Sequence, residues 1–235
     1  MKSMFDILMG LPLFRGVTRE RMAETVGMAK FHFLKYLPGE TVVTAGDPCT
    51  HIKFIISGSV RMTIENADKR FKVASSLAAP EVIAPSFLFG RATDYPCTVK
   101  AIEDTSILQV TKQDYLKILN SDAVFMLNFL NMLSVNAQKS VDGVLALTTG
   151  SMEERIAFWI VALTQPAAAD IVLSCRQRDL YSFFGVQRSS FIATLEAMKE
   201  QGLITYQGNE MNVVSRKAML DLLASCRMTD EQSEE

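Results

Sequence analysis

The chain has 235 residues, of which 49% are hydrophobic and 21% are charged, and its formal net charge is −2. This composition supplies apolar material for a sizeable core and excludes disorder as the main state. No apolar run reaches the roughly 18 residues that a membrane helix needs, so we expect no membrane partner. Asp6 and Arg15 interrupt the apolar start, which argues against a signal peptide, and four scattered cysteines indicate reduced thiols in the cytoplasm.

A series of short strands is predicted within residues 31–111. The segments 31–36, 52–56, 60–64 and 105–110 are rich in β-branched and aromatic residues, and turn signals such as Pro38-Gly39-Glu40 separate them. Strands at this spacing favour an antiparallel β-roll or jelly-roll domain over residues 1–120. Ahead of the strands, Thr18 is expected to cap a short helix.

One long helix is predicted from residue 122 to residue 147, within a dimerisation helix and hinge over residues 121–149. An apolar or small side chain recurs along it at alternating steps of four and three residues, which is typical of a coiled-coil seam: Met126, Leu130, Leu133, Ala137, Ser140, Val144 and Leu147. Phe125, Phe129 and Met132 form a second stripe on another face. We expect an identical helix from a second copy to cover the seam, although a helix buried on both faces of a monomer is the alternative.

A compact C-terminal module is predicted over residues 150–228. Ser151 and Glu154 form a capping box that starts its first helix, which ends near Pro166. Residues 180–186 and 187–195 then form two helices around a tight turn at Gly185, and two strands follow at 202–206 and 211–214. This pattern is typical of a winged helix-turn-helix, although an ordinary helical hairpin is the alternative.

The second helix of this module begins with polar and small residues, as a DNA recognition helix requires. We expect double-stranded DNA to be contacted by Gln187, Arg188, Ser189, Ser190 and Thr194. Electrostatic support is weak, because residues 170–217 carry six Lys or Arg and five Asp or Glu. Residues 229–235 are acidic and are predicted to form a disordered tail.

An α+β chain with a roll, a long helix and a winged helix-turn-helix resembles the Crp/Fnr superfamily of bacterial transcription regulators. The specific motifs are Gly39, Gly46-Asp47, Gly58-Ser59-Val60 and the stretch 180–203, and Leu11-Pro12-Leu13-Phe14 near the start resembles members from Bacteroidales. The resemblance implies a homodimer that binds DNA and RNA polymerase, with Arg188 as the guanine-reading arginine. Ser189 and Ala193 replace a glutamate and an arginine of the cyclic-AMP receptor, and Arg176 replaces the usual helix cap, so we expect a different operator.

The same resemblance implies an effector pocket in the roll, lined by Pro85, Ser86, Phe87, Tyr95, Cys97, Thr98 and Ala137. Cyclic-nucleotide-binding members hold the phosphate with a Gly-Glu-Leu segment and an Arg-Ser pair. Ala84-Pro85-Ser86 and Tyr95-Pro96 stand at those places, so the cationic partner of the phosphate is missing and we do not expect cyclic AMP. An apolar or redox-active effector, including haem, or no ligand at all remain as alternatives. No spacing favours a haem ligand among Cys97, His32, His51 or the methionines.

We therefore expect a homodimeric DNA-binding regulator whose roll senses an effector other than cyclic AMP or is free of ligand. The alternative is a ligand-binding regulatory subunit that uses its C-terminal module for protein contacts. An enzyme is not expected, because two distant histidines give neither a cupin-like metal site nor a catalytic triad.

Overall fold

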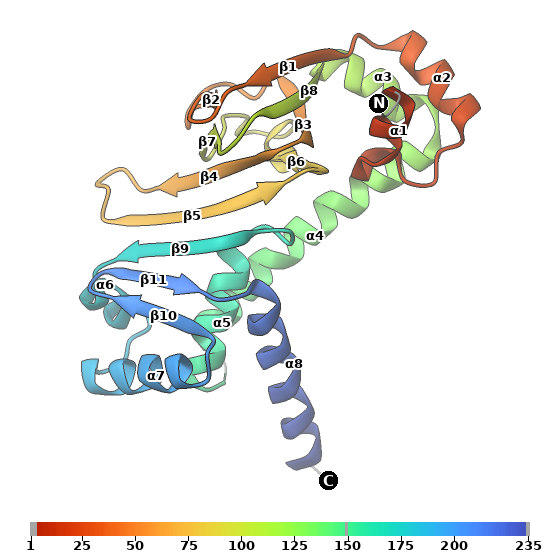
Figure 1. Ribbon diagram of the computed structural model, residues 1–235. Coiled ribbons are helices and arrows are strands. Elements are labelled where there is room, and N and C mark those ends of the chain that lie inside the picture. The colour runs from red at the N-terminus through yellow and green to blue at the C-terminus, as the bar shows by residue number, and fades with distance from the viewer. Residues whose placement is uncertain (1–3, 149, 234–235) are drawn as a thin grey trace. The chain divides into compact units, whose positions relative to one another are not determined.

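The computed structural model describes residues 4–148 and 150–233. Its helices are α1 (Met4–Met9), α2 (Arg19–Met28), α3 (Lys112–Ser121), α4 (Ala123–Thr148), α5 (Met152–Leu163), α6 (Gln177–Phe183), α7 (Arg188–Glu200) and α8 (Arg216–Ser233), with short 3-10 helices at Pro12–Phe14 and Pro85–Phe87. Its strands are β1 (His32–Tyr36), β2 (Thr41–Val43), β3 (His51–Ser57), β4 (Ser59–Glu65), β5 (Phe71–Ala78), β6 (Glu81–Ile83), β7 (Thr98–Ala101), β8 (Thr105–Thr111), β9 (Ala169–Cys175), β10 (Ile204–Gln207) and β11 (Glu210–Val213). The predicted α+β class is confirmed (Figure 1).

The chain forms two compact units. The first contains residues 1–62 and 77–136, and the second contains residues 63–76 and 137–235. This division differs from the predicted domains in two ways: α4 contributes to both units, and the hairpin segment 63–76 groups with the C-terminal residues.

The first unit is built on antiparallel strands. One sheet has the order β1-β8-β3-β6, and β2 pairs with β7. The predicted segments 31–36, 52–56, 60–64 and 105–110 coincide with β1, β3, β4 and β8. Sequence analysis missed the short strands β2 and β6, of three residues each, and β7, of four. It also missed β5, whose buried Ser75 and Ser76 give it a polar composition.

Aromatic side chains of α4 belong to the core of the first unit. Phe125 and Phe129 are buried, as the second apolar stripe of the helix predicts. The Phe125 ring meets Phe14 edge-on at 5.5 Å, and the Phe129 ring meets Tyr115 edge-on at 5.4 Å. The N-terminal half of α4 is therefore anchored to its own unit through one face.

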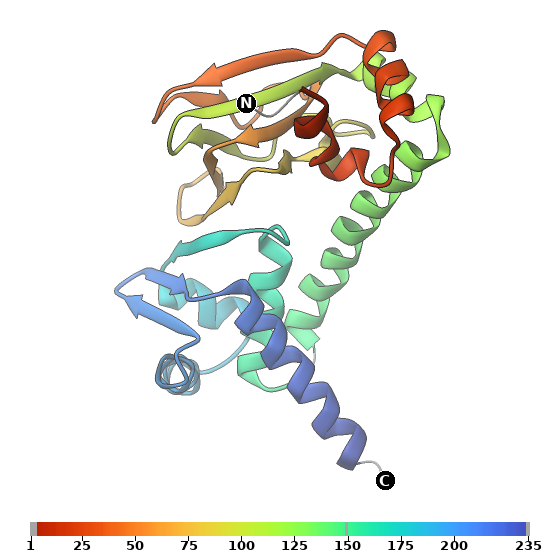
Figure 2. The same ribbon diagram turned by 45° about the vertical axis from the view of Figure 1, so that its right-hand side comes forward.

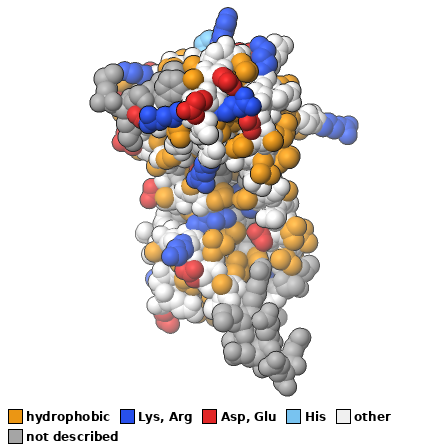
Figure 3. Space-filling view, turned by 90° about the vertical axis from the view of Figure 1, so that its right-hand side faces the viewer, with side chains coloured by type: hydrophobic (Ala, Val, Ile, Leu, Met, Phe, Trp, Pro, Cys, Tyr) orange, Lys and Arg blue, Asp and Glu red, His pale blue; other side chains and the backbone are white. Residues whose placement is uncertain are grey.

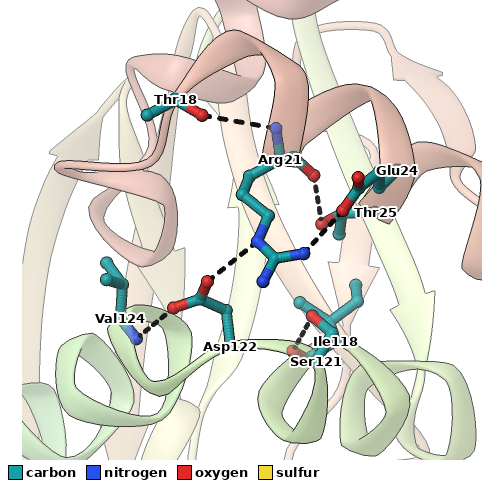
Figure 4. Close-up of polar contacts among 8 residues, drawn as sticks. All are labelled: Thr18, Arg21, Glu24, Thr25, Ile118, Ser121, Asp122 and Val124. Atoms are coloured by element: carbon teal, nitrogen blue, oxygen red, sulfur yellow. Dashed lines mark hydrogen bonds and ion pairs between the residues drawn. The ribbon is translucent and has the colours of Figure 1, made fainter.

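A polar cluster fixes the start of α4 (Figure 4). Arg21, on a helix that Thr18 caps as predicted, places its Nε 3.1 Å from Asp122 Oδ2 and its Nη1 2.7 Å from Glu24 Oε2. The other carboxylate oxygen of Asp122 accepts a hydrogen bond from the Val124 amide at 2.9 Å. Asp122 therefore caps the first turn of α4 and ties it to α2.

The second unit contains a sheet with the order β10-β11-β9-β5. β9 was not predicted: it lies between the helix that sequence analysis ends near Pro166 and the predicted helix-turn-helix. Val73 pairs with Leu173 across the β5–β9 ladder, and the Ser76 hydroxyl donates to Asp170 Oδ2 at 2.6 Å. The Phe71 ring lies 5.6 Å from that of Trp159, and these contacts explain why residues 63–76 belong to this unit.

The last helix, α8, runs to Ser233 and so overlaps the predicted tail of residues 229–235; residues 234–235 lie outside the described residues. Within the described ranges, no single helix is long and apolar enough to cross a membrane. The pair α3 and α4, bent by 118° at its break, meets that criterion by length and composition alone.

Neutralising Asp122 is expected to weaken the fold at neutral pH only. The amide of Val124 and the guanidinium of Arg21 favour the charged carboxylate, so the pKa of Asp122 lies below its ordinary value of 3.8. A lowered pKa contributes stability that is present above 3.8 and is lost as the pH falls through the lowered value. Denaturant unfolding of wild type and Asp122→Asn should therefore differ at pH 7, and the difference should shrink as the pH falls below 3.8 and vanish below the lowered pKa.

The matched control for that measurement is Asp68→Asn, because Asp68 faces Arg70 at 3.2 Å with both side chains exposed. An exposed pair of this kind contributes little, so this variant should unfold like wild type at every pH. A stability difference for Asp122→Asn that does not change with pH would contradict the account.

Candidate functional site

The two helices predicted as a helix-turn-helix are α6 and α7. Gly185 connects them with a φ of +68°, which confirms the left-handed turn expected there. The Val186 amide donates to the Tyr181 carbonyl at 3.0 Å and closes the turn. Arg176 is the N-cap of α6 and makes no capping hydrogen bond with its side chain, which instead binds Asp179 through Nε at 2.8 Å.

One face of α7 is buried and the opposite face is exposed. Phe191, Leu195 and Met198 are buried. At the start of the helix, four consecutive side chains are all exposed: Gln187, Arg188, Ser189 and Ser190. Figure 2 shows α7 nearly end-on beside the β10–β11 hairpin, which is the predicted wing.

Thr194, the fifth predicted DNA contact, is placed differently from the other four. It is half-buried, and its hydroxyl donates to the Ser190 carbonyl one turn earlier at 3.1 Å. Its hydroxyl hydrogen is therefore already used within the helix, and only part of the side chain faces outward.

The charged side chains of α7 differ in whether they have a partner within the chain. Arg188 makes no hydrogen bond or ion pair with any described residue, so its guanidinium is available to a partner. Glu196, the acidic residue in the middle of α7, accepts a hydrogen bond from the Tyr206 hydroxyl at 2.5 Å and lies 3.6 Å from Lys199 Nζ. The Tyr206 hydrogen bond lowers the pKa of Glu196, and it raises the pKa of Tyr206.

Sequence analysis missed this pairing of Glu196 with the wing, because no motif links two residues in different elements. Its effect is to hold the acidic charge against Lys199 and Tyr206. The start of α7 carries only cationic and polar exposed side chains, from Gln187 to Ser190.

Helix α4 exposes an apolar stripe over its whole length. Among the predicted seam residues, Leu130 is 50% exposed, Val144 60% and Leu147 45%, while Ala137 and Ser140 are exposed and Met126 and Leu133 are half-buried. Leu127 and Val141 are also exposed, at 57% and 60%, and the prediction omitted them. The most exposed line therefore passes through Leu127, Leu130, Ala137, Val141 and Val144, and a seven-residue repeat through 127, 134 and 141 is the sequence signal for it. Figure 3 looks onto the side where Figure 1 draws α4 and shows hydrophobic side chains gathered there.

Most of the predicted effector-pocket residues belong to the first unit. Pro85, Tyr95 and Cys97 are buried, Phe87 and Thr98 are half-buried, and Ser86 is exposed. Ala137 is exposed and belongs to the second unit. Ala84, which stands at the family's glycine, has a φ of +45° and so keeps a backbone conformation that glycine adopts more easily.

Polar groups around this segment are bound within the roll. The Tyr95 amide donates to the Asp47 carbonyl at 2.9 Å, and the Tyr95 hydroxyl donates to the His51 carbonyl at 3.2 Å. The Thr98 hydroxyl accepts from the Ala45 amide at 3.1 Å. Pro96 has no amide hydrogen, so this stretch offers few free donors to an anion.

The candidate haem ligands are not brought together. Burial raises the pKa of the Cys97 thiol to about 12, so the thiol stays protonated at neutral pH. His32 is exposed, whereas His51 is half-buried and its Nδ1 lies 2.8 Å from the Thr50 hydroxyl. In the part of the chain that the structure describes, no group of three His, Cys, Asp or Glu residues could hold a metal ion.

Two family models match the chain. Residues 33–122 match a cyclic nucleotide-binding domain, and residues 154–222 match a Crp-like helix-turn-helix domain. The chain is 22% identical to the cAMP-activated global transcriptional regulator Vfr of Pseudomonas aeruginosa, over 79% of this chain and 91% of that protein. It is 23% identical to the cyclic AMP receptor protein of Thermus thermophilus, over 83% and 88% of the two chains.

A solved structure shares the fold. The catabolite activator protein of Thermus thermophilus matches 91% of this chain and 99% of its own, with a TM-score of 0.53 and 19% sequence identity. The chain is therefore a Crp-like DNA-binding transcription regulator, with an effector-sensing domain of the cyclic nucleotide-binding type, and belongs to the Crp/Fnr family, which is not a family of enzymes.

Proposed function

We propose that this regulator is a homodimer that reads a near-palindromic DNA site through two copies of α7. The observation that carries the proposal is the free guanidinium of Arg188 among exposed Gln187, Ser189 and Ser190. Arginine can bind O6 and N7 of guanine together, and glutamine can do the same with an adenine. Thr194 is half-buried and its hydroxyl already donates within α7, so we propose that it makes only a van der Waals contact with DNA.

The exposed stripe of α4 supports the homodimer. Fully burying a Val or Leu side chain contributes roughly 1.5–3 kcal/mol, and Leu127, Leu130, Val141 and Val144 are all about half exposed. An identical helix is the simplest partner that could cover them, because a two-fold axis places each stripe against its own copy. Two α7 helices related by such an axis recognise DNA half-sites whose centres lie about one turn of the double helix apart, or about 34 Å.

The effector is proposed to be something other than cyclic AMP, or the roll acts without one. Tyr95 and Pro96 supply no cation, and Tyr95 and Thr98 are bound to backbone groups of the roll. An unpaired phosphate in a buried site costs several kcal/mol. One named relative is a cAMP-activated regulator and the other is a cyclic AMP receptor protein, and we propose that this chain has lost the response to cyclic AMP. Action in the cytoplasm and contact with RNA polymerase follow from the family alone.

Replacing Arg188 with alanine is expected to relax base preference in both halves of the operator. Each lost bidentate contact should cost about 1–3 kcal/mol on the operator and much less on random DNA. The measurement is a binding titration of wild type and Arg188→Ala against the operator, singly substituted operators and random DNA at one salt concentration. Lys217→Ala, an exposed cation on α8, is the matched control and should keep the base preference.

An equal loss of affinity for every DNA sequence would contradict this role for Arg188. The residue would then be a phosphate contact, which weakens all sequences alike and lowers the salt dependence by about one charge.

Cyclic AMP is expected not to bind the roll. Isothermal calorimetry with millimolar nucleotide should give no saturable heat with protein that binds its operator, and the nucleotide should leave operator affinity unchanged. A dissociation constant below about 10 µM, or −6.8 kcal/mol, would contradict the interpretation of Tyr95 and Pro96.

A further inference from the structure

Arg155, on the first turns of α5, joins the ends of two other helices. Its Nε donates to the Ala146 carbonyl at 3.1 Å, and its Nη2 donates to the Phe184 carbonyl at 2.6 Å. The guanidinium carbon also lies 5.5 Å from the centre of the Phe184 ring. All three residues belong to the second unit.

Both acceptors lie at helix C-termini, where carbonyl groups lack a partner within their own helix. Ala146 is in the last turn of α4, and Phe184 is the C-cap of α6. The C-terminal end of a helix carries a partial negative charge, so a cation there is stabilised by both dipoles. The planar guanidinium also fixes direction, because its N–H groups point along set lines.

The contact crosses the hinge between α4 and α5. Gly150 in this hinge has a φ of +75°, and a side chain there would collide with the Glu154 carboxylate, which accepts from the Ser151 amide in the predicted capping box. The backbone of the hinge sets where α5 begins, whereas Arg155 is the side chain that reaches from α5 both back to α4 and on to the turn before α7.

We propose that Arg155 is a positioning residue that fixes the direction of the recognition helix α7 relative to the dimer helix α4. The inference rests on the proposed two-fold reading of DNA. Phe184 directly precedes Gly185, so a restraint on its carbonyl is a restraint on the turn that aims α7. With Arg155 in place, the two α7 helices of a dimer are held at one separation.

This role predicts a specific change in how operators are read. Without the restraint, each α7 still reads its own half-site, but the separation of the two is less strictly set. Tolerance of altered half-site spacing should therefore increase, while affinity for a single half-site should stay close to that of wild type. A residue needed only for stability would lower the active fraction and weaken all spacings by the same factor.

Arg216 provides the matched control. It is another arginine of the second unit that contacts a helix C-terminus: it is buried at the start of α8, with Nε 3.2 Å from the Thr164 hydroxyl and Nη2 3.3 Å from the Val161 carbonyl. These contacts hold the end of α5 to the start of α8 and do not include Ala146 or Phe184. Arg216→Lys should therefore lower the melting temperature without changing the spacing preference.

The experiment compares wild type, Arg155→Lys, Arg155→Met and Arg216→Lys on operators whose half-sites are moved apart or together by one and two base pairs, and on a single half-site. Lysine keeps the positive charge but lacks the planar guanidinium that can donate to two carbonyl groups at once. Arg155→Lys therefore remains informative if Arg155→Met fails to fold. The penalty for a shifted spacing should fall about tenfold in both Arg155 variants, the effect of one charge-assisted contact.

A wild-type spacing penalty in Arg155→Lys would overturn the inference, and so would an equal loss of the penalty in Arg216→Lys. A wild-type protein that binds every spacing equally would overturn the proposed two-fold reading itself. That outcome is visible before any variant is measured, so the two failures can be told apart.

Discussion

Helix α4 carries two apolar faces, and the residues that the structure describes cover only one of them. Phe125 and Phe129 pack among aromatic residues of the first unit, whereas Leu127, Leu130, Val141 and Val144 remain about half exposed. An uncovered stripe along a helix of 26 residues is larger than the scattered exposed leucines of an ordinary surface. The proposed dimer depends on how that second face is covered, and so does the proposed separation of its two α7 helices.

The proposed DNA contact at the start of α7 depends on which charged side chains are already paired within the chain. Glu196, Arg176 and Arg155 are engaged by Tyr206, Asp179 and two helix ends, and Arg188 is left without a described partner. The module has almost equal numbers of acids and bases, so specificity cannot come from a strongly basic surface. We infer that a small number of directional contacts carries base recognition here, with their direction set by the turn at Gly185.

Sequence reasoning predicted the elements whose signals are local. Thr18, the Ser151–Glu154 capping box, Gly185 and the two stripes of α4 each follow from spacing within one segment, and the structure has the corresponding caps, turn and helix. It missed β5, whose buried Ser75 and Ser76 give it a polar composition, and β9, whose partners β5 and β11 lie in distant parts of the sequence. It also missed Arg155 and the Tyr206–Glu196 bond, because residues 29 and 10 positions apart are joined only by the fold.

Cysteine cross-linking along α4 tests most directly whether the exposed apolar stripe is the interface between two copies of the chain. In a chain with Cys226→Ser, Leu130→Cys and Val144→Cys should each form disulfide-linked dimers on mild oxidation, because a two-fold seam brings each position close to its own copy. Val135→Cys is also at an exposed position, 45% accessible, but lies about 140° around the helix from Leu130 and about 180° from Val144, so it should stay monomeric on a non-reducing gel. Equal cross-linking at all three positions, or none at Leu130 and Val144, would contradict a dimer built on this stripe.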